Sequence, residues 1–235
     1  MKKLVFTLLG VLLFLNLAIA QDYFKLGLEE EKKGNYEKAI EYYTMDIQIL
    51  PNPEAYYNRG FDFYLLKKYD EAIADYTKAI ELKPDFAQAY INRGNVYDDL
   101  KKYNEAIADY TKAIELKPDL AMAYYNRGNT YGRNLKKYDE AIADFTKAIE
   151  LKPDYMDAYV NRGIVNKNLK KYDEAIADYT KAIEMKPDTP QAYYGRGTAY
   201  KLIGDCDNAK KDWEKTIILE PSMEIMLRQL INACK

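Results

Sequence analysis

Apolar and aromatic residues along most of the chain keep the spacing of one helix face. In residues 53–86 they recur at intervals of four and three, first in one segment and then in a second. These positions are Tyr56, Gly60 and Phe63, followed by Ala72, Tyr76 and Ala79. Pro84 comes after the second set, where a proline ends a helix. The pattern predicts two short helices, and the small residues indicate that they approach each other closely.

This pair of helices recurs along the chain. The segment KKYDEAIADYTKAIELKPD at 67–85 returns three times with few changes, and two weaker copies flank the series. The close copies are 101–119, 136–154 and 170–188, and the weaker ones are 35–52 and 205–222. The central alanine of successive copies is Ala39, Ala72, Ala106, Ala141, Ala175 and Ala209, at spacings of 33, 34, 35, 34 and 34. One such pair cannot bury its apolar side alone, so neighbouring pairs must stack.

A period near 34, with aromatic–x3–Gly–x2–aromatic, then Ala–x3–aromatic and a closing proline, resembles the tetratricopeptide repeat family. The resemblance covers residues 21–223 and implies an all-α fold, a right-handed α-solenoid of helix-turn-helix repeats. We number repeat positions from one, so that the glycine is at position 8, and name the two helices A and B. The expected repeats are 21–52, 53–86, 87–120, 121–155, 156–189 and 190–223. Residues 224–235 are expected to form a C-terminal capping helix, with a partner-binding amphipathic tail as the alternative.

The fourth copy is one residue longer than its neighbours, around YGRN at 131–134. Gly132 and Asn134 in this stretch predict a longer turn between helices A and B, or a bulge.

Arginine at position 7 and aspartate at position 23 occur together in five copies and are both missing from the first. The residues are Arg59, Arg93, Arg127, Arg162 and Arg196, with Asp75, Asp109, Asp144, Asp178 and Asp212. We interpret them as structural ion pairs rather than ligand contacts, within one repeat or between neighbours. Asp144→Ala is expected to be worse than Arg127→Leu, because it leaves a buried cation unpaired.

Asparagine at position 6 is off the buried stripe of helix A. The residues are Asn58, Asn92, Asn126 and Asn161. In the family this side of helix A lines a concave groove, so the resemblance implies an amide ladder that holds a peptide backbone. The remaining groove candidates are Tyr57, Tyr64, Asn95, Tyr125, Asn129 and Tyr194. The alternative is that these asparagines belong to the ordinary scaffold. The sequence lacks the Lys/Asn/Arg clamp with which chaperone-binding members hold a C-terminal carboxylate.

Lysine pairs occur at every turn between helices A and B in the four close copies. They are 67–68, 101–102, 136–137 and 170–171. Stacking would align them as a basic edge, which is either solvated or a binding surface for an anionic polysaccharide or lipid.

Residues 1–20 have the features of a secretory signal peptide: Lys2 and Lys3, an apolar run, and a small-residue ending at Ala20. Cleavage would make Gln21 the first residue and leave no membrane span, so we expect a periplasmic or extracellular protein. Cys206 and Cys234 are the two cysteines, and an oxidising compartment permits a disulfide between them. The sequence alone leaves their pairing open.

Composition excludes several kinds of chemistry. The chain has no histidine, and Ser222 is its one serine, so Ser-His-Asp triads and HExxH zinc sites are ruled out. No metal or cofactor is expected, and the formal net charge of −2 argues against nucleic-acid binding. The sequence therefore predicts a non-enzymatic protein-interaction scaffold that binds a protein or peptide partner. The partner's identity and the oligomeric state stay open.

Overall fold

The structure is a computed structural model, and it describes residues 19–234. Every regular element in that range is a helix, which confirms the predicted all-α class. The predicted signal peptide, residues 1–20, lies outside the described residues except for Ile19 and Ala20. By its contacts the chain divides into two units, Met1–Pro118 and Asp119–Lys235, and each is described by itself.

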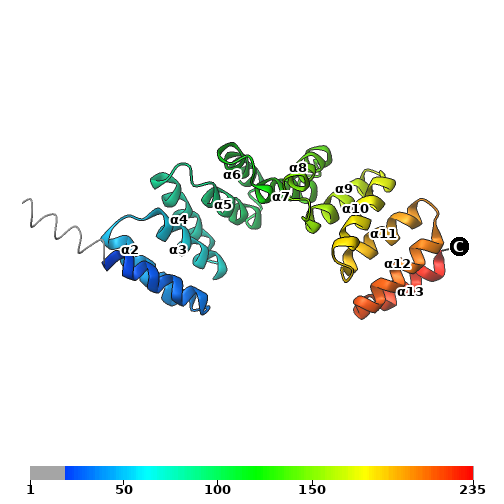
Figure 1. Cartoon of the computed structure of the whole chain (residues 1–235), viewed down its shortest axis with the longest axis horizontal. Coiled ribbons are helices and arrows are strands. Elements are labelled where there is room, and N and C mark those ends of the chain that lie inside the picture. The colour runs from blue at the N-terminus through cyan, green and yellow to red at the C-terminus, as the bar shows by residue number, and fades with distance from the viewer. Residues whose placement is uncertain (1–18, 235) are drawn as a thin grey trace, which may run out of the picture. The chain divides into compact units, whose positions relative to one another are not determined.

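In the first unit, successive helices pair as hairpins joined by short turns (Figure 1). Residues 19–32 are helical, followed by α2 (Tyr36–Ile49), α3 (Pro53–Leu65), α4 (Tyr69–Leu82), α5 (Ala87–Asp99) and α6 (Tyr103–Leu116). Helices α3 and α4 are A and B of one repeat, and α5 and α6 are A and B of the next.

The second unit continues the same order and adds a cap. Its elements are α7 (Ala121–Asn129), the π-helical turn η1 (Thr130–Asn134), α8 (Tyr138–Leu151), α9 (Met156–Asn168), α10 (Tyr172–Met185), α11 (Pro190–Leu202), α12 (Cys206–Leu219), the 3-10 turn η2 (Pro221–Met223) and α13 (Glu224–Ala233). Here α7, α9 and α11 are A helices, and α8, α10 and α12 are B helices.

A large aromatic ring at position 24 fills the space between helices A and B. These rings are all at most 2% exposed: Tyr43, Tyr76, Tyr110, Phe145, Tyr179 and Trp213. The glycine at position 8 makes room for the ring, because a Cβ atom on Gly94 would lie 2.7 Å from Cε1 of Tyr110. Ala72 and Ala79 are fully buried on helix B. The small residues thus permit the close approach that the sequence predicts.

The turn between helices A and B is a Schellman motif. In the second repeat the N–H of Lys68 donates to the carbonyl of Phe63, and that of Lys67 to the carbonyl of Tyr64. The motif needs a left-handed residue after the helix, and Lys67 has φ +58°. The residues in the same conformation are Lys101, Lys136 and Lys170, with Gly34 and Gly204 at the turns of the first and last repeats. Glycine adopts this conformation freely, whereas a residue with a Cβ atom pays about 1–2 kcal/mol.

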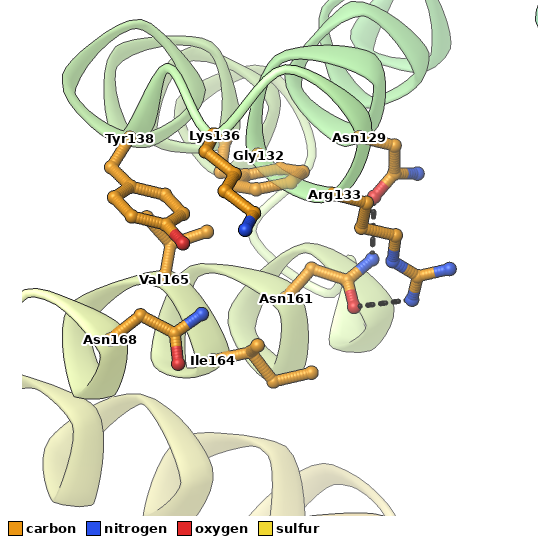
Figure 2. A pocket seen from close by; sticks show the side chains of 10 residues that line it. Asn129, Gly132, Arg133, Lys136, Tyr138, Asn161, Ile164, Val165 and Asn168 are labelled. Carbon is orange, nitrogen blue, oxygen red and sulfur yellow. Dashed lines mark hydrogen bonds between the residues drawn. The ribbon is translucent and has the colours of Figure 1, made fainter.

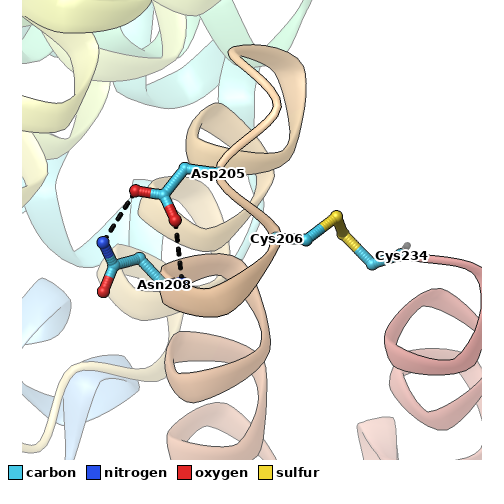
Figure 3. Close-up of a disulfide and its surroundings, with 4 residues drawn as sticks. All are labelled: Asp205, Cys206, Asn208 and Cys234. Atoms are coloured by element: carbon cyan, nitrogen blue, oxygen red, sulfur yellow. Dashed lines mark hydrogen bonds between the residues drawn. A yellow bond between two sulfur atoms is a disulfide. The ribbon is translucent and has the colours of Figure 1, made fainter.

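Helix α13 covers the end of the last repeat. Leu227 is fully buried in a cluster with Trp213 and Ile217. Cys206 at the start of α12 and Cys234 after α13 form a disulfide, with Cα atoms 5.5 Å apart (Figure 3). The structure thereby ties the cap covalently to the helix that it covers.

Candidate functional site

The predicted groove residues lie on the A helices of both units. They are Tyr57, Asn58 and Tyr64 on α3, Asn92 and Asn95 on α5, Tyr125, Asn126 and Asn129 on α7, Asn161 on α9 and Tyr194 on α11. Helices α3 and α5 belong to the first unit and the other three to the second, so the structure presents two groups of candidate residues.

In the first unit, Tyr57 and Asn92 are joined across neighbouring repeats. The side-chain amide of Asn92 donates to the hydroxyl of Tyr57 over 2.9 Å. The Tyr57 ring also packs against Phe86 and Tyr76, with ring centroids 4.9 and 5.8 Å apart. Asn92 therefore ties two repeats together as well as being a candidate ligand contact.

Two further groove candidates in this unit have partners inside the protein. The hydroxyl of Tyr64 donates to Asp99 Oδ2 of the next repeat over 2.9 Å, in an exposed position. Burial, and then this bond, raise the pKa of Tyr64 to about 12. Asn95 Oδ1 accepts a hydrogen bond of 2.8 Å from the Tyr110 hydroxyl of its own repeat. Asn58 is partly buried on α3.

In the second unit, Asn161 joins three other side chains. Its Nδ2 donates to the Tyr125 hydroxyl over 3.0 Å and to Asn129 Oδ1 over 2.8 Å. Its Oδ1 accepts a hydrogen bond from Arg133 Nη2 over 3.0 Å. Asn161 is 5% exposed, and the Tyr125 ring packs on Tyr155 at 4.8 Å. The structure thus brings together three predicted residues and adds an arginine that the sequence did not single out.

The remaining two candidates in this unit are partly buried. The main-chain carbonyl of Asn126 accepts a hydrogen bond of 3.2 Å from the Thr130 hydroxyl. Tyr194 packs against the cluster around Trp213.

The extra residue of the fourth repeat is taken up by η1, so the expected irregular turn is present. The N–H of Lys137 bonds to the carbonyl of Tyr131, six residues back, whereas Lys102 bonds to Tyr97, five residues back. Beside this wider turn lies a cavity of about 260 Å³ against α9 (Figure 2).

The cavity is lined by polar and cationic side chains together with apolar ones. The polar side chains are Asn129, Arg133, Lys136, Asn161 and Asn168. The apolar ones include Phe145, Ile164 and Val165. Arg133 and Asn168 were not predicted as site residues, and Lys136 was predicted only as part of the lysine edge. The sequence signal near Arg133 was the additional residue at 131–134.

The ion pairs are intrarepeat and bidentate. Arg59 donates through Nε to Asp75 Oδ2 over 2.7 Å and through Nη2 to Asp75 Oδ1 over 2.8 Å. The same geometry of paired guanidinium and carboxylate recurs in the other four repeats: Arg93 with Asp109, Arg127 with Asp144, Arg162 with Asp178 and Arg196 with Asp212.

Several of these arginines also reach the preceding repeat through a threonine hydroxyl. Arg59 Nη1 donates to Thr44 over 2.8 Å, and Arg93 Nη1 donates to Thr77 over 2.9 Å. The sequence left open whether each arginine pairs within its own repeat or with a neighbouring one. In the structure, its carboxylate partner belongs to the same repeat and its hydroxyl partner to the preceding repeat. Each such arginine stabilises both a repeat and an interface between repeats.

A buried acid in the first unit was also missed. Asp62, at position 10 of its repeat, is fully buried, and within the described residues neither carboxylate oxygen has a hydrogen-bond partner. Burial, and then the charge of Glu31, raise the pKa of Asp62 to about 8. The later repeats have Val96, Thr130, Val165 and Ala199 at this position. Comparing the second repeat with the later ones at position 10 would have found this acid.

Residues 19–234 contain no helix long and apolar enough to cross a membrane. Over the same residues, no three His, Cys, Asp or Glu side chains are grouped so that they could hold a metal ion.

Comparison with protein families matches most of the chain to this repeat. Models described as tetratricopeptide repeat match residues 53–86 and 121–155, 75–108 and 145–177, and 21–44. A model described as TPR repeat matches residues 94–134 and 167–204.

Solved structures share the fold. MamA protein is 30% identical with a TM-score of 0.66, over 73% of this chain and 93% of that one. YrrB is described as a TPR protein with an unusual peptide-binding site. It is 25% identical with a TM-score of 0.68, and the match covers 80% of this chain and 96% of YrrB. PilF of Pseudomonas aeruginosa, at 21% identity and a TM-score of 0.79 over 94% and 99%, shows likeness of fold alone. These structures confirm the predicted tetratricopeptide solenoid class.

Curated relatives match over shorter stretches. An uncharacterised protein of Methanocaldococcus jannaschii is 36% identical over 58 residues, 24% of this chain and 67% of that protein. Sperm-associated antigen 1 of Rattus norvegicus is 40% identical over 58 residues, but this is 25% of this chain and 6% of that protein.

Proposed function

Because the chain belongs to the tetratricopeptide repeat family, we propose that it is a non-enzymatic interaction module whose A helices bind a segment of a partner protein. The observation that carries the proposal is the group around Asn161, in which the side chains of Asn129, Arg133 and Asn161 border an open cavity. Tyr138 also lines this cavity. Tyrosine and amide groups suit a wet recognition surface, because they combine apolar contact area with hydrogen bonding. YrrB, a similar protein, is described as having a peptide-binding site.

The test is selection of peptides from a random 12-residue library on the protein beginning at Gln21. Binding of the selected peptides is then measured by fluorescence anisotropy. Tyr64→Ala tests the candidate residues of the first unit, and Ile164→Ala tests those of the second. The variant whose unit binds the peptide is expected to weaken binding at least about fivefold. Lys112→Ala, on the exposed face of a B helix, is the matched control and should leave affinity unchanged. Failure to select any peptide, or equal binding by all three variants, would overturn the proposal.

We further propose that the protein is exported to the periplasm or the extracellular space. The support is the signal-like sequence of residues 1–20 and the disulfide between Cys206 and Cys234, which is typical of oxidising compartments. N-terminal sequencing of protein from the native cell should begin at Gln21. A sequence that begins at Met1 in a reduced, cell-internal protein would contradict it.

A second candidate function is an envelope adaptor that binds an anionic surface through the lysine edge. The observation that favours it is the left-handed conformation of Lys67, Lys101, Lys136 and Lys170, since glycine would fit these turns with less strain. Dextran sulfate and vesicles containing phosphatidylglycerol are suitable probes. Binding should weaken with salt and be lost when all four lysines become glycine. Salt-independent binding, or full binding by the fourfold variant, would exclude this function.

A further inference from the structure

We propose that the cavity between η1 and α9 is a subsite for an acidic side chain, an aspartate or glutamate of the bound partner segment. The inference rests on the proposed function, and it names the chemistry that this part of the surface recognises. It is a subsite for a side-chain carboxylate within a segment and not for the end of a chain.

Arg133 lacks a carboxylate partner among the described residues. Of the seven arginines in the sequence, five pair with the aspartate of their own repeat, and Arg228 pairs with Glu214 and Glu224. Within residues 19–234, Arg133 has no carboxylate within ion-pair distance, and its hydrogen bond goes to the neutral amide of Asn161. A guanidinium has five N–H donors, so Arg133 can accept a carboxylate in bidentate fashion while it keeps Asn161.

The charged side chains that line the cavity are both cationic. Lys136 lines it together with Arg133, and no aspartate or glutamate does. Lys136 likewise has no carboxylate within ion-pair distance among the described residues. Two cations and no acid at one cavity make a local positive charge on a protein whose net charge is negative. An anion that enters there is attracted by both groups.

The two cations come from the irregular turn of the fourth repeat. Arg133 is in η1, the one π-helical turn in residues 19–234, which the extra residue of the fourth repeat creates. Lys136 follows in the left-handed conformation, with φ +55°. Isolated π turns frequently occur at functional sites because the inserted residue redirects side chains. Figure 2 shows Arg133 and Lys136 at the edge of the cavity above Asn161 and Ile164.

The cavity also has the size and the lining that suit an acidic side chain. A volume of about 260 Å³ accommodates an acidic side chain with water around it. Ile164 and Val165 provide apolar contact for the methylene groups of the side chain. Asn129 and Asn168 add amide groups to the lining. Glutamate fits this combination of an apolar stem and a charged end better than a small inorganic anion does.

The test uses peptides selected on the wild-type protein, with three versions of each: parent, acidic residue replaced by its amide, and parent with an amidated C-terminus. Arg133→Gln and Lys136→Gly are expected to weaken the parent about tenfold each, because each removes a charge-assisted contact. Lys136→Gly removes the positive charge without straining the backbone, because glycine readily adopts the left-handed conformation of Lys136. Lys170→Gly makes the same change at the next turn, outside the cavity, and should have no effect. Thermal melts confirm that each variant is folded.

The expected result is coupling: the amide version of the peptide binds wild type and Arg133→Gln equally weakly, whereas Arg133→Lys retains part of the affinity. Peptides that bind tightly and lose nothing when the acid or Arg133 is replaced would overturn the subsite and leave the proposed function standing. Loss on C-terminal amidation alone would overturn the side-chain assignment in favour of a chain end. Absence of any selected peptide would overturn the proposed function and the subsite together. A direct check is titration with N-acetylglutamate, which should shift the NMR signal of the Asn161 side-chain amide, while N-acetylglutamine should not.

Discussion

The hydroxyl of Tyr57 accepts a hydrogen bond of 2.9 Å from the side-chain amide of Asn92, which lies in the next repeat. The same relationship joins Tyr125 and Asn161 in the second unit, over 3.0 Å. Asparagine at position 6 therefore has a structural role between neighbouring repeats in these two copies. The repeats that precede Asn58 and Asn126 have Phe24 and Ile91 at position 5, so this role accounts for two of the four asparagines.

Removing the Tyr57 hydroxyl should weaken the interface between the second and third repeats. Tyr57→Phe keeps the ring but loses the bond, and we expect a loss of about 1 kcal/mol in the free energy of unfolding, measured in urea. Tyr56→Phe is the control, because within the described residues the Tyr56 hydroxyl makes no side-chain hydrogen bond. Equal losses in the two variants would show that the bond to Asn92 has no stabilising role.

The ion pair of Arg93 and Asp109 should respond unequally to loss of either partner. The side chain of Asp109 is 8% exposed and that of Arg93 is 16% exposed, so the carboxylate is the more buried member. Arg93→Met leaves that carboxylate unpaired, with an expected cost of about 3–5 kcal/mol. Asp109→Asn keeps a polar partner for the guanidinium and should cost less. This order reverses the one expected from sequence, which treated the cation as the buried group.

Urea unfolding of both single variants and of the double variant tests this prediction. The double variant should be more stable than the sum of the single effects implies, because no charge is then left unpaired. A larger loss for Asp109→Asn at pH 7 would contradict the argument from burial.

The left-handed lysines should be sites of local strain. Lys101 has φ +60°, and Lys101→Gly relieves the contact of its Cβ atom with the backbone. Glycine also makes the unfolded chain more flexible, so the net gain should be about 0.5–1 kcal/mol. Lys102→Gly, one residue later, lacks this benefit and should destabilise or have no effect. A gain in thermal stability from both changes, or from neither, would contradict the role of φ.

The disulfide should hold the capping helix on the last repeat. Cys206 and Cys234 are 28 residues apart, and a cross-link that closes a loop of this length contributes about 3–4 kcal/mol in the chain-entropy treatment. Cys234→Ser, and wild type with reductant, should therefore show a similar decrease in thermal stability. Reductant should not affect Cys234→Ser further. An unchanged melting curve for reduced wild type would contradict this role.

The hairpins and their core were predictable because local spacing determines them. The glycine, alanine and aromatic positions of Gly94, Ala106 and Tyr110 recur in every full repeat, with one additional residue between the first two in the fourth repeat. The hydrogen-bond partners of Asn161 were not predictable from the sequence, because they depend on how one repeat stacks on another. The additional residue near Gly132 was visible in the sequence, but whether it formed a loop or a π turn decides where Arg133 points. Asp62 was also visible, yet its lack of a partner is a property of the packed structure.

Asp62 should make the stability of the protein fall as pH rises. Its pKa is about 8 in the folded protein, against an ordinary value of 3.8. Between these values the folded state binds one more proton than the unfolded state at this site. The free energy of unfolding therefore decreases with rising pH, by at most about 1.4 kcal/mol per pH unit. The contribution is fully present below about pH 4 and is lost as the pH passes through 8.

Asp62→Val provides the comparison, since valine occupies the corresponding position in two later repeats, as Val96 and Val165. This variant should be more stable than wild type at pH 9 and should lack this pH dependence. Glu31 raises the pKa of Asp62, so Glu31→Gln should move the midpoint of the transition to lower pH. Asp70→Asn, an exposed acid on α4, controls for a general effect of charge. Urea unfolding from pH 5 to pH 9 measures all four proteins. If the free energy of unfolding changes with pH in the same way for wild type and Asp62→Val, the prediction is wrong. Asp62 would then be ionised throughout this range, stabilised by a partner in the folded protein.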